Sequence, residues 1–394
     1  MISFLFENSV FLIVGTVAGL VWANVSHESY THIKHIVFFK NFIFGTLQNN
    51  GTRVFDFHYF INDFMMATFF AIAGKEVWEA TMGGGPLSDA KRAAVPIFAA
   101  VGGMVVPAVI YLFGAYLSGQ YNELSTGWAI PGATDIAFSY MIIRLIFGPG
   151  HPAIPFLLLL AIVDDAIGLM ILAIFYPQEE VQFAWMALPV VAFGIGYLFN
   201  RIKIASFWPY LLVPGFISWI GFAKAGLHPA LSLLPIIPIM PHAHSDKGLF
   251  NWQEMEDTTD TLTRFEKWWK NPVELVLMLF GFLNAGVLFS AVGAPTVLVI
   301  SGLLLGKPIG IWLSTMIAAK GLKLGLPKGI SQKELLVVGF AAGIGFTVAL
   351  FVATVAFPAG PVQDAAKMGA LGSFIAVLIT FALAKILRVG RYQK

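Results

Sequence analysis

Apolar runs of about 20 residues recur along the whole chain, and each is long enough to cross a hydrocarbon layer of about 30 Å as a helix. The composition agrees, because 58% of the 394 residues are hydrophobic and 12% are charged, whereas a soluble domain carries roughly 25% charged residues. We therefore predict an all-α polytopic membrane protein with about 12 transmembrane helices, forming a single membrane domain over residues 1–394. The predicted spans are 9–27, 59–81, 95–117, 125–147, 153–176, 184–199, 207–222, 226–241, 272–292, 294–318, 335–357 and 363–387.

The charge and cysteine counts exclude several other classes of protein. The formal net charge is +2 and no basic cluster is visible, so we expect no nucleic-acid partner. The chain has no cysteine, which excludes a disulfide framework and a thiolate metal site. Met1 to Asn8 lacks the positive region of a cleavable signal peptide, so we expect the first span to remain in the protein.

Lys and Arg residues should concentrate in cytoplasmic loops. If the N-terminus is inside, 18 of the 24 Lys and Arg residues fall in inner loops and ends, five fall outside, and Lys307 lies within a span. This bias predicts that both termini are cytoplasmic. The segment 28–58 is then an external loop, in which the turn Gln48–Gly51 predicts a short β-hairpin. The polar segment 242–271 is then a cytoplasmic loop, with a short helix near 258–270.

Four ionisable side chains fall near the middle of apolar runs: Asp135, Asp164, Asp165 and Lys307. Each costs about 2.5–3.5 kcal/mol at the centre of a membrane helix. The sum, roughly 10 kcal/mol, is comparable with the whole stability of a typical protein. A structural ion pair between one Asp and the Lys would account for two of the four and leave two carboxylates over, which favours a functional role for the group.

Asp164 and Asp165 are adjacent, and neighbouring side chains on a helix point about 100° apart. One can therefore face a partner helix while the other faces a cavity. Burial and mutual repulsion both favour the protonated form of a carboxyl group, so such a pair can exchange a proton for a cation. Oxygen ligands suit a hard cation such as Na⁺. We predict that Asp164 and Asp165 form the cation and proton site.

Asp135 follows Pro131 and Gly132, which disfavour a continuous helix. An ordinary proline kink is the alternative. A second glycine-rich stretch contains Gly343 and Gly345, and interrupted segments at corresponding places in two halves indicate a transporter built from inverted repeats. The repeats would be the third to fifth and the tenth to twelfth spans. Broken helices place helix ends at the midplane, where Asp135 and Lys307 would offset the dipole fields.

At these residues the chain resembles the NhaA family of bacterial sodium/proton antiporters. The resemblance extends over roughly residues 55–388. The Ala133-Thr134-Asp135-Ile136-Ala137-Phe138 string followed by the Asp pair is its most specific part. The other matching strings are Gly127-Trp128-Ala129-Ile130-Pro131, Gly306-Lys307-Pro308 and Gly343-Ile344-Gly345-Phe346-Thr347.

The resemblance implies two crossing, broken helices and electrogenic exchange of Na⁺ or Li⁺ for a larger number of protons, activated at alkaline pH. It also implies that Asp165 is the main cation ligand. Asp164 would alternate between a proton or cation and a salt bridge to Lys307. Thr134 and Asp135 would line the site and balance the helix dipoles.

The resemblance is weaker in two cytoplasmic segments that belong to the pH-response surface of the family. Residues 75–80 keep Glu76 but lack a basic pair, so we expect a more negative local field. Residues 264–270 keep only Glu266 of a Glu- and His-bearing string. His228 matches a third family residue linked to pH response, although a lone histidine at a helix end is more often structural.

Other functions fit the residues less well. An intramembrane aspartyl protease needs Gly-x-Gly-Asp, and here Phe346 follows Gly345. A channel would carry acidic rings or a repeated filter. The remaining alternative is another inverted-repeat transporter, such as an organic-anion/sodium symporter, which would not need adjacent carboxylates. We therefore predict a secondary antiporter in the bacterial inner membrane, not an enzyme and without a cofactor. Its partners would be Na⁺ or Li⁺, protons, the lipid bilayer and, through the hairpin at 46–58, a second copy of the chain.

Overall fold

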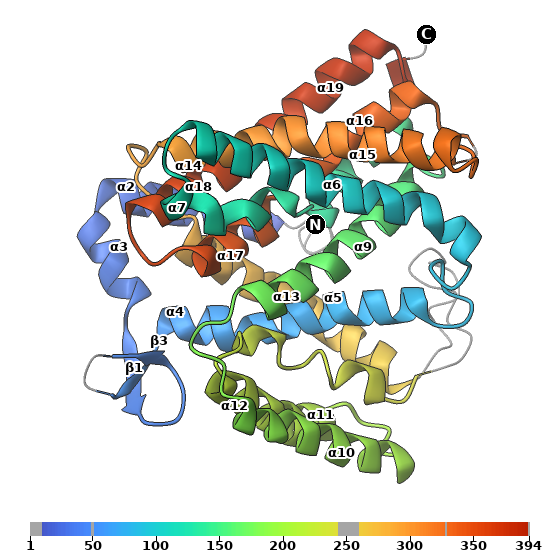
Figure 1. The fold of residues 1–394 in the computed structure, drawn as a ribbon. Coiled ribbons are helices and arrows are strands. Elements are labelled where there is room, and N and C mark those ends of the chain that lie inside the picture. The colour runs from blue at the N-terminus through green and yellow to red at the C-terminus, as the bar shows by residue number, and fades with distance from the viewer. Residues whose placement is uncertain (1–9, 49–50, 243–259, 328, 393–394) are drawn as a thin grey trace. The chain divides into compact units, whose positions relative to one another are not determined.

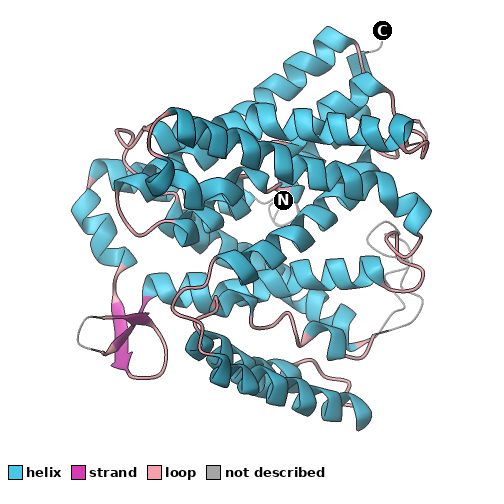
Figure 2. Cartoon of the chain, in the orientation of Figure 1, coloured by secondary structure: helices cyan, strands magenta, loops and turns pink. Residues whose placement is uncertain are grey.

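The computed structural model describes residues 10–48, 51–242, 260–327 and 329–392 (Figure 1). The chain divides into two compact units. Unit 1 comprises the described residues within 10–85 and 169–286, and unit 2 comprises those within 86–168 and 287–392. Almost every described element is helical, and the strands are confined to one small sheet (Figure 2).

Unit 1 begins with two helices and a three-stranded sheet and continues into a long helical run. Its elements up to residue 85 are α2 (Val10–Val25), α3 (His27–Lys34), β1 (Val37–Asn41), β2 (Thr46–Leu47), β3 (Arg53–Asp56), α4 (Phe57–Tyr59), η1 (Phe60–Met65) and α5 (Met66–Thr81). Its later elements are η3 (Phe183–Met186), α10 (Ala187–Arg201), α11 (Trp208–Tyr210), η4 (Leu211–Gly215), α12 (Phe216–Ala225), η5 (Pro229–Leu231), η6 (Ile237–Ile239) and α13 (Thr261–Asn284).

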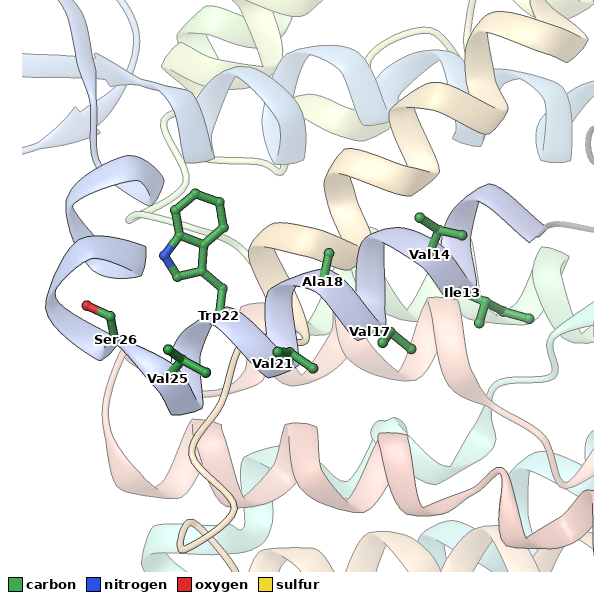
Figure 3. Close-up of a pocket in the computed structure, with 8 residues that line it drawn as sticks. All are labelled: Ile13, Val14, Val17, Ala18, Val21, Trp22, Val25 and Ser26. Carbon is green, nitrogen blue, oxygen red and sulfur yellow. The ribbon is translucent and has the colours of Figure 1, made fainter.

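Helix α2 packs closely on α13 because glycines on α2 face the α13 backbone. A β-carbon on Gly15 would overlap the carbonyl of Met278, and one on Gly19 would overlap that of Phe282. Small residues allow this approach between membrane helices. The opposite face of α2 is apolar and exposed, with side chains such as Val17 and Val21 pointing outward (Figure 3), a composition that suits contact with lipid chains.

The sheet is antiparallel with strand order β1-β3-β2. Its central strand, β3, forms a salt bridge with a loop of the same unit, in which Arg53 Nη2 lies 2.7 Å from Glu179 Oε2. Asp56 at the end of β3 then begins the helical run, since its Oδ1 accepts a hydrogen bond of 2.8 Å from the Tyr59 amide. A side-chain acceptor of this kind satisfies a free amide in the first turn of a helix.

Unit 2 is built of helices, several of which are interrupted. Its elements up to residue 168 are α6 (Ala90–Leu117), α7 (Tyr121–Leu124), η2 (Ser125–Gly132), α8 (Ile136–Phe147) and α9 (Ala153–Phe175), which continues into unit 1. The later elements are α14 (Ala294–Ser301), η7 (Gly302–Gly306), α15 (Lys307–Met316), η8 (Ile317–Gly321), α16 (Gln332–Ala342), α17 (Phe346–Ala356), α18 (Pro361–Gly372), α19 (Ile375–Leu387) and η9 (Gly390–Tyr392).

Helices α6 and α15 run side by side in unit 2 (Figure 1). A β-carbon on Gly310 would overlap the carbonyl of Gly102, and one on Gly306 would overlap the backbone of Pro107. Glycine therefore permits backbone contact along this pair. The contact places Lys307, between the two glycines, against the interior of unit 2, where its side chain is fully buried.

Two predicted spans are broken near their middles. Residues Ala133–Asp135 separate η2 from α8, with a bend of 48°, and Gly343–Gly345 separate α16 from α17, with a bend of 49°. The two breaks contact each other, because the Asp135 amide donates a hydrogen bond of 2.6 Å to the Ile344 carbonyl. A β-carbon on Gly345 would lie 3.0 Å from the Ala133 carbonyl, so glycine permits this contact.

Within the described residues, five helices are long and apolar enough to cross a membrane, and the two broken pairs raise this number to seven. The prediction of a membrane span at 226–241 is wrong. These residues contain only the short 3₁₀ turns η5 and η6, because four prolines interrupt the stretch. The helix expected near 258–270 and the span expected at 272–292 form one helix, α13. The rest of the predicted 242–271 loop falls largely on residues 243–259, outside the described residues.

Candidate ion-binding site

The centre of the site is a buried contact between α9 and α15. Asp164 and Lys307 are buried side chains of unit 2, and Lys307 Nζ lies 2.9 Å from Asp164 Oδ2. The hydroxyl of Thr134, in the first break, donates a hydrogen bond of 2.7 Å to the same oxygen. The structure therefore brings together three residues predicted from the sequence, and it pairs the buried lysine with the first aspartate of the adjacent pair.

The second oxygen of Asp164 differs from the first. Asp164 Oδ1 is buried and has no hydrogen-bond partner among the described residues. A buried carboxylate oxygen without a donor is costly, and a hard cation or a proton would satisfy it. Asp165, the next residue of α9, is only half-buried and acts electrostatically on Lys307. The charges in this cluster are thus two carboxylates and one ammonium group.

Asp135 caps two helix starts at once. Its Oδ1 accepts a hydrogen bond of 3.4 Å from the amide of Phe138 in α8. Its Oδ2 accepts from the amide of Thr347 at 3.3 Å and from the hydroxyl of the same residue, at the start of α17. Helix starts carry free amides and a partial positive charge, so one buried carboxylate offsets both.

Polar side chains bind the last carbonyls of the two helices that end at the breaks. Lys307 Nζ donates to the carbonyl of Gly132, the last residue of η2. At the end of α16, the Ser139 hydroxyl donates to the Ala341 carbonyl at 2.8 Å, and the Thr134 hydroxyl lies 3.2 Å from the Ala342 carbonyl. The structure thus places Asp135 at two helix starts and Lys307 at one helix end, and their opposition to the helix dipoles stays a prediction.

Ser139 is one residue of this site that we did not predict, and Thr347, which binds Asp135, is another. Ser139 is fully buried one turn into α8, and its only sequence signal is a small hydroxyl side chain in an otherwise apolar helix. Its contact with Ala341 depends on how α8 and α16 pack. Pro131, Gly132, Gly343 and Gly345, in contrast, lie at or beside the breaks, as predicted from their residue types.

Comparison with known proteins identifies the family of the chain. The family model described as "Na+/H+ antiporter 1" matches residues 5–384. The chain belongs to this antiporter family.

Curated antiporter relatives match along almost their whole length. The Na(+)/H(+) antiporter NhaA of Jannaschia sp. is 48% identical, with 99% of each chain covered. The protein of the same name from Geobacter sulfurreducens is 42% identical, with 99% of this chain and 98% of the relative covered. The sodium/proton antiporter MjNhaP1 from Methanocaldococcus jannaschii has a similar fold, with a TM-score of 0.54 at 14% identity over 98% of this chain and 92% of that one.

The residues that resemble the pH-response surface of the antiporter family lie in unit 1. Glu266 of α13 lies 2.6 Å from Lys75 Nζ on α5, and Glu79 lies 2.5 Å from the same nitrogen. For the Glu76 side chain, no hydrogen bond or ion pair is recorded among the described residues. The loss of the basic pair after Glu76 is thus partly offset by Lys75, a buried cation that binds both glutamates.

His228 lies before η5 in unit 1 and is buried. Its Nδ1 accepts a hydrogen bond of 3.3 Å from the Ala230 amide and lies 3.7 Å from Asp63 Oδ1. The structure therefore places His228 next to a carboxyl group, that of Asp63, which we did not select from the sequence. Its cap on η5 accords with the structural alternative for this residue, and its role in pH response stays a prediction.

Proposed function

We propose that the protein is a secondary active antiporter that exchanges Na⁺ or Li⁺ for protons. The observation that carries this proposal is the state of Asp164: Lys307 and Thr134 bind one carboxylate oxygen, while the other is buried without a partner among the described residues. A site that only stabilised the fold would be expected to satisfy both oxygens. Membership of the antiporter family supports the same conclusion.

The carboxylates supply the chemistry of exchange. We propose that Asp165 is the main cation ligand, and that Asp164 joins it through Oδ1 and leaves its salt bridge with Lys307. Two carboxylates can carry two protons, whereas one monovalent cation brings a single positive charge. If both protons leave when one Na⁺ binds, a cycle moves unequal charge in the two directions. Exchange is then electrogenic and responds to the membrane potential.

Lys307 and Asp135 would keep the breaks intact while the site changes its occupant. When Asp164 leaves the salt bridge, Lys307 retains the Gly132 carbonyl as an acceptor. Asp135 makes its contacts to Phe138 and Thr347 without using Asp164. We therefore assign Asp135 and Thr134 to lining and electrostatic balance, and Asp164 and Asp165 to binding.

The same proposal includes the placement of the chain in the membrane. We infer a bacterial inner-membrane protein with about 12 spans, in two inverted repeats, with cytoplasmic termini because Lys and Arg favour the inner loops. Activation at alkaline pH would involve Glu76, Glu266 and His228. The sheet formed by β1, β2 and β3 would lie outside the membrane and contact a second copy in a homodimer.

The test is proton movement in proteoliposomes that contain the purified protein and a pH-sensitive dye. After an acid-inside gradient is set, Na⁺, Li⁺, K⁺ and choline are added outside in turn. We expect Na⁺ or Li⁺ to dissipate the gradient and choline to leave it unchanged. The Asp165→Asn protein is the inactive control, and Glu123→Gln, at an exposed position on α7, is the matched active control. Sodium uptake without proton movement would instead indicate a sodium symporter.

A further inference from the structure

A carboxyl group outside the proposed exchange site lies in the interior of unit 1. Asp63 belongs to η1, a π-helical segment between α4 and α5, and its side chain is 13% exposed. Segments of π-helix are rare and often occur at functional sites. The charged partner expected for a buried carboxylate would be His228, whose Nδ1 is 3.7 Å from Asp63 Oδ1, a distance beyond a hydrogen bond.

The hydrogen bond made by His228 indicates which group carries the proton. Its Nδ1 accepts from the Ala230 amide, and a ring nitrogen that accepts a hydrogen bond has no proton of its own. In this arrangement His228 is not an imidazolium ion. The Nδ1 atom therefore offers Asp63 Oδ1 neither a hydrogen nor a positive charge, and an ionised Asp63 would lie 3.7 Å from a second acceptor.

The other groups that act on Asp63 offer no positive charge. Asp56 lies near enough to repel an ionised Asp63, and its own carboxylate already binds the His35 ring at 2.9 Å and the Tyr59 amide. The Tyr59 phenol is a neutral neighbour. From α12, the Trp219 indole donates to the backbone carbonyl of Asp63 and not to its side chain. No Lys or Arg contact with the Asp63 carboxyl is recorded among the described residues.

We propose that Asp63 is a second proton-binding site of this protein: a neutral carboxylic acid in the interior of unit 1, beside the uncharged ring of His228. This assignment removes the contact between two acceptors and leaves no uncompensated buried charge. It rests on the proposed function only in that it refines the part assigned to His228, because the titrating group of this pair is Asp63. Loss of the proton in alkaline medium would leave an anion that Asp56 repels and that the uncharged His228 ring does not compensate, and would destabilise this part of unit 1.

The proton on Asp63 can be detected directly by infrared spectroscopy, because a neutral carboxylic acid has a C=O stretching band distinct from those of carboxylates. We expect a band in the wild-type protein at neutral pH that is absent from Asp63→Asn and that disappears from the wild type on alkaline titration. Asp56→Asn is the matched control, since the Asp56 carboxylate is already satisfied by two donors, and it should retain the band. A wild-type spectrum that Asp63→Asn leaves unchanged would overturn the proposal.

Thermal unfolding separates the neutral pair from an ion pair. If folding holds a proton on Asp63 that the unfolded chain releases, this contribution is complete in acid and is lost as the pH rises. Asp63→Asn binds no such proton, so the melting temperature of this variant should rise relative to that of the wild type as the pH increases. If the two residues form an ion pair, Asp63→Asn should be destabilised at neutral pH and rescued by adding His228→Gln. Neither readout needs transport, so a failure of the proposed exchange would not be mistaken for a failure of this inference.

Discussion

Lys307 joins Asp164 to the end of a broken helix: its ammonium group lies 2.9 Å from Asp164 Oδ2 and also donates to the Gly132 carbonyl. The carboxylate is a proposed ligand of the transported ion, and the carbonyl belongs to the last residue of η2. Any change in the charge of Asp164 therefore alters its attraction for Lys307, which also binds the last carbonyl before the break. Replacing Lys307 should therefore affect the stability of the fold more than it affects transport.

Replacing Asp165 by Asn should abolish exchange and leave the fold intact, because an amide can neither carry the proton nor balance Na⁺. Asp165 is half-buried, so the amide also causes little steric change. Proton movement in proteoliposomes measures exchange, and thermal unfolding in detergent checks the fold. Glu123→Gln is the control for the loss of one carboxylate. Normal exchange by a well-folded Asp165→Asn protein would remove this residue from the mechanism.

Replacing Lys307 by Gln should lower stability clearly and leave some exchange. Removing one partner of a buried ion pair costs about 3–5 kcal/mol, and Asp164 avoids part of that cost when it takes a proton. That proton is held less easily as the pH rises, so the deficit should be largest in alkaline buffer and smaller in acid. Melting temperatures of this variant and of Lys333→Gln, at an exposed position, should be compared across pH. A constant difference would argue against pairing with Asp164.

Replacing Lys75 by Met should destabilise unit 1, because Glu79 and Glu266 would be left as neighbouring, largely buried carboxylates. The expected loss is about 3–5 kcal/mol. Adding Glu266→Gln should recover part of the loss, since it removes one of the two like charges. Chemical denaturation of the single and double variants measures both effects. If the double variant is less stable than Lys75→Met, the glutamate has another partner that matters more.

Replacing Ser139 by Ala should weaken the crossing of the broken helices, because the Ala341 carbonyl loses the donor that lies 2.8 Å away. The carbonyl keeps its hydrogen bond of 3.2 Å from the Ile344 amide, so the expected loss is that of one hydrogen bond, about 0.5–1.5 kcal/mol. Ser301→Ala is the matched control, since its hydroxyl donates to a carbonyl of its own helix. Thermal unfolding of both variants measures the difference. Equal melting temperatures would show that Ser139 does not support the end of α16.

The apparent affinity for Na⁺ should depend on pH if Na⁺ and protons compete for Asp164 and Asp165. Each proton that must leave before Na⁺ binds weakens the affinity about tenfold per pH unit of acidification. A slope near one in log affinity indicates one displaced proton and a steeper slope indicates two, and it belongs to the coupled pair as a whole. Rates in proteoliposomes with equal pH on both sides measure this. A constant affinity with a falling maximum rate would indicate a separate conformational gate.

The sequence by itself determined the membrane class, the buried charges and both helix breaks. Apolar runs long enough for a bilayer need no tertiary information, because their length and composition already exclude water as the solvent. Pro131 and Gly132 disfavour a helix through their own backbone chemistry. The cost of a charge in an apolar run likewise selects Asp135, Asp164, Asp165 and Lys307 before any contact is known.

Only the tertiary structure decided the partners of these groups. Adjacent aspartates are equivalent in the sequence, and only the placement of α9 against Lys307 makes Asp164 the one whose carboxylate lies 2.9 Å from the ammonium group. The same holds for Ser139, whose acceptor, the Ala341 carbonyl, is 202 residues away in the chain. It also holds for Lys75, because only the packing of α13 on α5 brings Glu266 to its ammonium group. Hydrogen bonds and ion pairs act over about 3 Å, and the distances between residues far apart in the chain are set by packing.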